Sequence, residues 1–238
     1  MEQVVLLPGL MCDERLFRPL IQVLKKKYRV HTPVMTQIKS MDEMANFVLS
    51  SISGPFHTVG FSMGGIIAMT VAIKDPGRIK TMVLMDTSPY SDSSRKQAAR
   101  DIQLDAVSDC SELERIVAQE LKPNYVYDEK SNQHILDLCM KMALDLGCEV
   151  FVNQCLALRN RDSLIDLLSR IECKTLVLCG EYDKLCPVRV HEEMVAQISN
   201  SKLSIIPNCG HFPILEEPEL SAREIMSFLD MGWSECRV

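Results

Sequence analysis

Long apolar runs are missing from the sequence, and none reaches the roughly 18 residues of a candidate transmembrane helix. The first residues, Met1-Glu2-Gln3-Val4, lack the basic and then apolar pattern of a signal peptide. Blocks of basic residues are also missing, and the net charge is −6. Nucleic-acid binding requires a concentrated positive surface, so nucleic acid is disfavoured as a partner. We therefore expect a cytoplasmic protein without a membrane span.

Paired cysteines of the kind that bind zinc are missing as well. The ten cysteines fall singly along the chain, with no C-x-x-C pair. A chain of this size without a secretory signal does not depend on disulfides for a core. We therefore expect most of the cysteines to be reduced, partly buried thiols that pack as small apolar side chains.

Short β-rich segments alternate with helical patterns over most of the chain. This alternation is typical of an α/β protein with a mostly parallel sheet and helices on both faces. Strands are expected at residues 4–7, 28–32, 57–60, 80–85, 174–179 and 203–206.

The alternation stops between residues 88 and 171, where only helical patterns are found. Apolar residues within 135–146 repeat at helical spacing, and Gly147 is expected to end that helix. We predict a core made of residues 1–87 and 172–238 and an all-helical cap, or lid, at 88–171. Inserted between two strands, the cap is expected to cover the carboxyl edge of the sheet, where such sheets bind ligands.

The segment Gly60-Phe61-Ser62-Met63-Gly64 is the strongest functional signal in the sequence. It matches G-x-S-x-G and lies between a predicted strand and an apolar helical stretch, which is the context of a nucleophile elbow. The glycines allow strand and helix to approach closely at a sharp turn. Ser62 is therefore the candidate nucleophile.

A serine hydroxyl needs a neighbouring base and a group that orients the base. His211 follows the last predicted strand, in a loop at the same edge of the sheet as Ser62, and is the candidate base. Asp183, in the loop after the strand ending at Cys179, is the favoured acid. Glu181 and Asp86 are the alternatives, since both lie near ends of strands.

The developing oxyanion of an acyl-transfer reaction also needs hydrogen-bond donors. The backbone N–H of Met63, directly after the nucleophile, lies at the positive end of the predicted helix. A second donor is expected from the loop after the first strand, where Gly9 permits a sharp turn. The N–H of Leu10 is the candidate.

These motifs, in this order, resemble the α/β-hydrolase superfamily and cover the whole chain apart from the cap. The matching segments are Leu6-Leu7-Pro8-Gly9-Leu10, Gly60 to Gly65, Asp75-Pro76-Gly77-Arg78-Ile79, Gly180-x-x-Asp183 and Gly210-His211-Phe212-Pro213. The chain looks like the small, cap-containing carboxylesterases, a group that includes the pimeloyl-ester hydrolase. The resemblance implies an α/β-hydrolase fold, a Ser62–Asp183–His211 triad, and neither metal nor organic cofactor.

The chain departs from this family at the first turn, where most relatives have His-Gly and this sequence has Pro8-Gly9. Both oxyanion donors are backbone groups, so catalysis should survive the change. From the resemblance we also expect this chain to lack the first two strands of larger relatives. The fold alone does not name a substrate.

Side chains of the cap are the candidates for substrate contact. Arg159 and Arg161 can recognise a carboxylate or phosphate bidentately, while Met140 and Phe151 are candidates for an acyl tunnel. The alternatives are that Arg161 and Asp162 tie the last cap helix to its neighbours, with Asp162 as its N-cap, and that the apolar residues are cap core.

The sequence therefore predicts a serine hydrolase that cleaves a small-molecule carboxylic ester or thioester of a small to medium acyl group. A lyase or perhydrolase with the same triad is one alternative. A ligand-binding receptor with vestigial turnover is the other.

Overall fold

A parallel six-stranded sheet forms the centre of the computed structural model, which describes residues 1–107 and 111–230. The strands are β1 (Glu2–Leu7), β2 (Tyr28–His31), β3 (Phe56–Phe61), β4 (Ile79–Met85), β5 (Lys174–Gly180) and β6 (Ser201–Ile206). Their order across the sheet is β2-β1-β3-β4-β5-β6, and each neighbouring pair is parallel. The predicted sheet is confirmed, with every strand end within two residues of its expected position.

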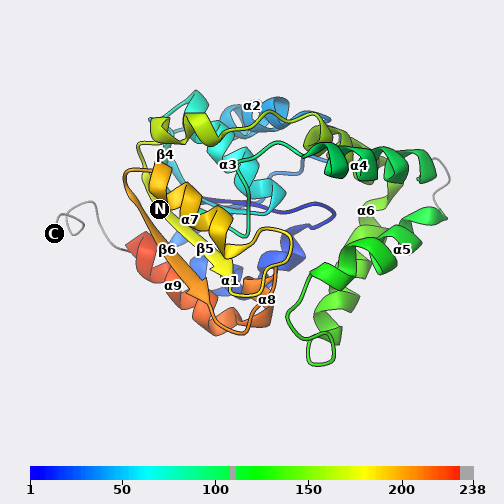
Figure 1. Cartoon of the computed structure of the whole chain (residues 1–238). Coiled ribbons are helices and arrows are strands. Elements are labelled where there is room, and N and C mark those ends of the chain that lie inside the picture. The colour runs from blue at the N-terminus through cyan, green and yellow to red at the C-terminus, as the bar shows by residue number, and fades with distance from the viewer. Residues whose placement is uncertain (108–110, 231–238) are drawn as a thin grey trace.

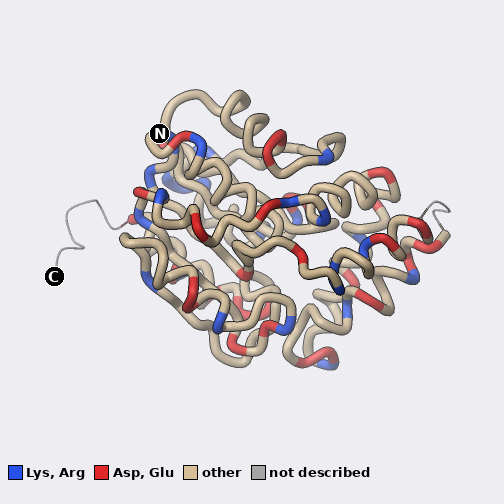
Figure 2. The backbone as a smooth tube through the Cα atoms, turned by 45° about the horizontal axis from the view of Figure 1, so that its top comes forward, with Lys and Arg blue, Asp and Glu red and all other residues tan. Residues whose placement is uncertain are grey.

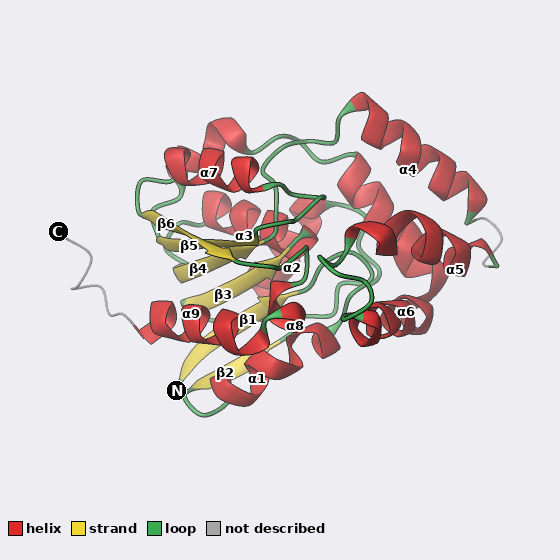
Figure 3. Ribbon diagram, turned by 60° about the horizontal axis from the view of Figure 1, so that its bottom comes forward, coloured by secondary structure: helices red, strands yellow, loops and turns green. Residues whose placement is uncertain are grey.

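Helices cover both faces of the sheet, as Figure 3 shows. The α-helices are α1 (Arg18–Leu24), α2 (Met41–Ser51), α3 (Met63–Lys74), α4 (Ser94–Ala106), α5 (Glu112–Ile116), α6 (Gln133–Arg159), α7 (Val188–Gln197), α8 (Pro213–Glu216) and α9 (Pro218–Asp230). Shorter helical segments are η1 (Glu14–Phe17), η2 (Val117–Leu121), η3 (Lys122–Asn124) and η4 (Ile165–Arg170). Helices α2, α3 and α7 contribute to the hydrophobic cluster on one face, and α1 and α9 to that on the other.

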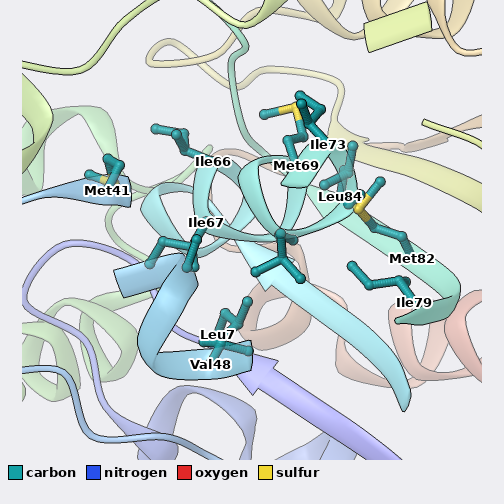
Figure 4. Close-up of a cluster of buried hydrophobic side chains, with 14 of the residues drawn as sticks. Leu7, Met41, Val48, Ile66, Ile67, Met69, Ile73, Ile79, Met82 and Leu84 are labelled. Carbon is teal, nitrogen blue, oxygen red and sulfur yellow. The ribbon is translucent and has the colours of Figure 1, made fainter. Parts of the chain in front are cut away.

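The central strands are apolar on both faces because both faces are covered. Along β1, Val5 and Leu7 face the cluster around α3, whereas Val4 and Leu6 face the cluster around α1. Figure 4 shows Leu7 of β1 and Ile79, Met82 and Leu84 of β4 beside α3 in this cluster. This helix is buried along nearly its whole length, so its position relative to the sheet is fixed by packing on all sides.

The cap forms from α4, α5 and α6, which follow β4 and precede β5, and no strand occurs among its described residues. In Figure 1 these helices lie together at one end of the sheet. Their own core includes Ile116, Phe151 and Cys155. An all-helical segment inserted between two strands is therefore present, as predicted.

The predicted break in the helix at Gly147 is confirmed. Gly147 has non-helical backbone angles (φ 80°, ψ 178°), and α6 consists of two helical segments that meet at this kink, the second ending at Arg159. The apolar residues on both sides of the kink are buried, including Met142 before it and Phe151 after it. Both segments therefore pack against the rest of the protein, and the chain changes direction at the glycine.

Acidic and basic residues are interspersed along the chain in the view of Figure 2. Within the described residues, no helix is both long enough and apolar enough to cross a membrane.

The close contact between α3 and β1 predicts that one methyl group added at Gly64 strongly destabilises the fold. A Cβ added at Gly64 would lie 1.9 Å from the carbonyl oxygen of Leu7, a backbone atom held in the central sheet. We expect Gly64→Ala to lower the free energy of unfolding by about 3 kcal/mol or more, as measured by urea denaturation. Gly77→Ala is the matched control, since its added Cβ would meet only Asp75 Oδ1 at 4.0 Å. Equal stability of the two variants would contradict this packing.

Buried His191 on α7 predicts a pH dependence of stability. Its Nε2 accepts a hydrogen bond from the N–H of Thr87, and burial lowers its pKa from 6.5 to about 4. Below pH 6.5 the unfolded chain therefore binds a proton at His191, whereas the folded chain does not. The free energy of unfolding consequently falls as the pH falls towards 4. We expect His191→Gln to flatten this loss by about 3 kcal/mol between pH 7 and pH 4, at about 1.4 kcal/mol per pH unit. Parallel stability curves for the two proteins would contradict the prediction.

Candidate active site

Ser62 lies in the sharp turn between β3 and α3, with backbone angles of φ 51° and ψ −114°. A non-glycine residue adopts this region only where its surroundings impose it, and such residues concentrate at functional sites. The N–H of Ser62 donates to Met85 O at 2.9 Å, and its carbonyl accepts from the Thr87 hydroxyl at 2.7 Å. Two bonds to the end of β4 and the segment after it thus hold the turn.

A continuous chain of hydrogen bonds connects Ser62, His211 and Asp183. Nε2 of His211 lies 3.1 Å from Ser62 Oγ, and Nδ1 lies 2.8 Å from Asp183 Oδ2. The imidazole is 3% exposed and the carboxylate is fully buried. The structure therefore brings together the three residues that the sequence placed in separate loops.

The loop that carries His211 is held by the cap as well as by the core. The N–H of His211 donates to Tyr125 O, in the cap, at 2.8 Å. Its ring lies 5.0 Å from that of Phe61, centroid to centroid. Beyond the loop, Glu216 accepts the N–H groups of Gly210 and Phe212. These contacts consequently fix the position of the His211 imidazole beside Ser62.

Asp183 is the acid in contact with His211, rather than Glu181 or Asp86. Its Oδ1 accepts the backbone N–H groups of Leu185 at 2.8 Å and Cys186 at 3.1 Å. Burial opposes ionisation, but His211 and these two donors outweigh it, so the pKa of Asp183 is lowered. Asp183 is therefore a carboxylate at neutral pH.

The two alternative acids have other partners. Glu181 accepts the N–H of Asn208 at 3.2 Å and does not contact His211. Asp86 is fully buried and accepts the N–H of Gly180 at 2.9 Å. Burial, together with the nearby charge of Asp183, raises the pKa of Asp86 well above its usual range. Asp86 therefore holds a proton more readily than Asp183 does.

The predicted oxyanion donors, Leu10 and Met63, both line the cavity that contains Ser62. Met63 is the first residue of α3, and neither its N–H nor that of Leu10 donates to another described residue. A Cβ on Gly9 would lie 3.2 Å from the Cβ of Ser62 and 2.9 Å from the ring of Phe61. Only glycine lets this loop approach the serine so closely.

The loop after β1 is also anchored by a cap residue that the sequence did not suggest. Gln154 on α6 accepts the N–H of Met11 at 2.8 Å, and both side chains are buried. Met11 has a positive φ of 54°. A glutamine in a helix carries no local signal for this bond, which joins residues far apart in the sequence.

A cavity of about 230 Å³ lies between the core and the cap, with Ser62 and His211 in its lining. Its apolar lining includes Ile66, Leu121, Leu158, Leu185 and Phe212. Among the described residues, its acidic and basic lining comprises Asp92, Lys96, Arg100 and Arg161. The cavity is therefore small, largely apolar and positively charged at one side.

The four predicted substrate contacts are not all near this cavity. Arg161 lines it, but Arg159 forms an ion pair with Asp101 outside it. Phe151 is fully buried in the core of the cap, and Met140 packs against the same cluster. Helix α6 presents these residues to its neighbours in the cap rather than to Ser62.

Arg161 also has the structural contacts that were considered as its alternative role. It donates to Tyr90 O and Leu158 O and pairs with Asp92. Asp162 is not the N-cap of the last cap helix, because η4 begins after Leu164. Asp92, Lys96 and Arg100 were not predicted as site residues. The spacing of four between Lys96 and Arg100 places them on one face of α4, whereas Asp92 precedes that helix.

Asp183, Cys186 and His211 each place a potential metal ligand within 4.8 Å of the others. Nδ1 of His211 is bonded to Asp183, and Nε2 faces Ser62, so both ring nitrogens are already engaged. A metal ion would break this chain of hydrogen bonds. The group is better understood as part of that chain than as a metal site.

A larger cavity, of about 630 Å³, lies at the opposite edge of the sheet, where the strands begin. His57 and Thr81 line it and are hydrogen-bonded to each other at 2.7 Å. Ligands of parallel sheets bind at the carboxyl ends of the strands, and this cavity is at the amino ends. We therefore place the candidate active site at Ser62.

Comparisons with known proteins identify relatives of this chain. Monoacylglycerol lipase ABHD6 from Homo sapiens is 22% identical over 192 residues, which are 74% of this chain and 55% of the lipase. The chain thus spans about half the length of that relative. Pimeloyl-(acyl-carrier protein) methyl ester esterase from Legionella pneumophila (strain Paris) is 23% identical over 224 residues, 91% of this chain and 90% of the esterase.

Solved structures show the same arrangement of elements. A thermophilic esterase from Thermogutta terrifontis, solved with malate bound, has a TM-score of 0.88 and 25% identity, over 96% of this chain and 89% of that one. The enol-lactonase from Burkholderia xenovorans LB400 has a TM-score of 0.85 at 17% identity, over 97% and 92% of the two chains, and shows the fold alone. The model of the alpha/beta hydrolase family matches residues 4–224. This chain therefore belongs to the alpha/beta hydrolase family.

Proposed function

We propose that this protein is a serine hydrolase that cleaves a carboxylic ester or thioester through an acyl-enzyme on Ser62. The observation that carries the proposal is the unbroken chain of hydrogen bonds from Asp183 through His211 to Ser62, at the wall of a cavity. Ester hydrolysis is also named for relatives that match most of this chain, including the Legionella esterase. The fold alone would not distinguish this activity from others.

The geometry supports a two-step mechanism. Ser62 Oγ attacks the carbonyl carbon of the ester and transfers its proton to His211 Nε2. Asp183 stabilises the resulting imidazolium and fixes the proton on Nδ1. The N–H groups of Leu10 and Met63 bind the oxyanion, and the imidazolium then protonates the departing alcohol or thiol. Water, deprotonated by His211, attacks the acyl-enzyme and releases the acid.

The cavity limits the acyl group. Its volume of about 230 Å³ is below the roughly 300–1,000 Å³ of cavities that bind drug-sized ligands. Apolar side chains from both core and cap form much of the wall. These dimensions favour a small to medium acyl group that is mostly enclosed during the reaction.

The first test is hydrolysis of p-nitrophenyl esters from acetyl to lauroyl by the wild type and Ser62→Ala. We expect measurable turnover by the wild type, a preference for the shorter esters, and loss of at least about 10³-fold in the variant, since the nucleophile is missing. Ser88→Ala is the matched control, because Ser88 lines the same cavity without contacting His211. Equal turnover by wild type and Ser62→Ala would contradict the proposal.

The role of Asp183 is tested separately against that of Asp86. Asp183→Asn should lower kcat by roughly 10⁴-fold, because the amide cannot stabilise the imidazolium and favours the wrong tautomer. Asp86→Asn should cost less than about tenfold, since His211 contacts Asp183 instead and an amide oxygen can still accept the N–H of Gly180. The steady-state kinetics of both variants give the comparison. The reverse order of effects would assign the orienting acid to Asp86.

A further inference from the structure

One wall of the cavity beside Ser62 has more positive than negative charge. Lys96 and Arg100 on α4, together with Arg161 after α6, contribute three cations. Asp92 is the one acidic residue among the described residues that line this cavity. The wall therefore has an excess of two positive charges.

Asp92 is shared between the two arginines. Its Oδ2 lies 2.5 Å from Nε of Arg100, and its Oδ1 lies 3.0 Å from Nη1 of Arg161. The side chains of Asp92 and Arg161 are 1% and 8% exposed. One carboxylate can neutralise only one guanidinium, so the second charge is buried without full compensation. A buried charge is costly unless it has a partner of opposite sign.

Each guanidinium also retains hydrogen-bond donors. Arg161 donates from Nε to Tyr90 O and from Nη1 to Leu158 O, and it forms an ion pair with Asp92 without a hydrogen bond to Oδ1. Arg100 uses Nε for Asp92 and directs Nη1 towards the sulfur of Cys155 at 3.9 Å. No described residue accepts a hydrogen bond from Nη2 of either arginine. Burial lowers the pKa of Arg161, as expected for a guanidinium that has lost water without gaining an equal share of negative charge.

We propose that this cationic wall, formed by Lys96, Arg100 and Arg161, binds a carboxylate in the acyl part of the substrate. The preferred substrates are then monoesters or monothioesters of short dicarboxylic acids. This inference rests on the proposed function, since it identifies the substrate class of the same site. The acyl part remains on Ser62 after the alcohol or thiol has left, so an anchor for it acts in both steps.

Packing within the cap does not require the excess positive charge of this wall, whereas binding of a substrate carboxylate does. Asp92 is sufficient to join α4 to the segment after α6, and a single arginine would complete that bridge. A substrate carboxylate would accept hydrogen bonds from the unused N–H groups of Arg100 and Arg161. It would also reduce the net positive charge of the wall. A charge-assisted pair of this kind also fixes orientation, because a guanidinium and a carboxylate meet in a planar, bidentate geometry.

The test compares monomethyl and dimethyl esters of the same diacids, from succinate to pimelate, at pH 8. We expect the wild type to prefer the monomethyl ester by at least about tenfold in kcat/KM at its best chain length, the effect of one charged hydrogen bond. Arg161→Gln and Arg100→Gln should each reduce this ratio by about tenfold, chiefly through KM. Arg159→Gln is the matched control, because Arg159 pairs with Asp101 outside the cavity, and it should leave the ratio unchanged.

Arg100→Gln preserves the test if Arg161→Gln fails to fold. Hydrolysis of both esters with a wild-type ratio near one would overturn the carboxylate site and leave the esterase proposal intact. The same conclusion would follow if the folded arginine variants kept the wild-type preference, or if Arg159→Gln removed it. Failure to hydrolyse any ester in either series would overturn the proposed function, and this inference with it.

Discussion

The close approach of α3 to β1 is the constraint on which the site depends. Gly64 lies so near the Leu7 carbonyl that no side chain fits, and this contact fixes the turn in which Ser62 adopts a positive φ. A helix buried on nearly all sides cannot move to relieve that strain. Packing energy from the core thus maintains a backbone conformation that is unfavourable by itself, which is a common arrangement at functional sites. The serine hydroxyl is consequently directed at a base that another loop supplies.

The same pattern extends around the site. The non-glycine residues with positive φ in the described part of the chain are Met11, Ser62, Asp86 and Asn208, and each lies near an end of a strand at the carboxyl edge. The cap contributes fixed contacts to two of these loops, through Tyr125 O to His211 and Gln154 to Met11. Core and cap together hold the base and the candidate oxyanion loop. The cap is therefore part of the support of the site as well as a wall of its cavity.

The sequence predicted those features whose causes are local or repeated. Alternating strands and helices located the sheet, and the glycine spacing around Ser62 indicated the turn. Gly147 interrupts α6 where the sequence placed the end of a helix, because glycine adopts a positive φ at little cost. The pairing of Asp92 with Arg161 and the bond from Met11 to Gln154 were missed because each joins segments that are distant in sequence. Such pairings follow from how the cap folds back over the sheet, and no short motif encodes them.

The central claim is that His211 activates Ser62 as a nucleophile. Labelling with a fluorophosphonate, followed by mass spectrometry of the digested protein, measures this directly because the reagent reacts with activated serines. The account predicts one adduct, on the peptide that contains Ser62, and a labelling rate at least about 10³-fold lower in His211→Gln. No adduct, an adduct on another residue, or an equal rate in His211→Gln would contradict it.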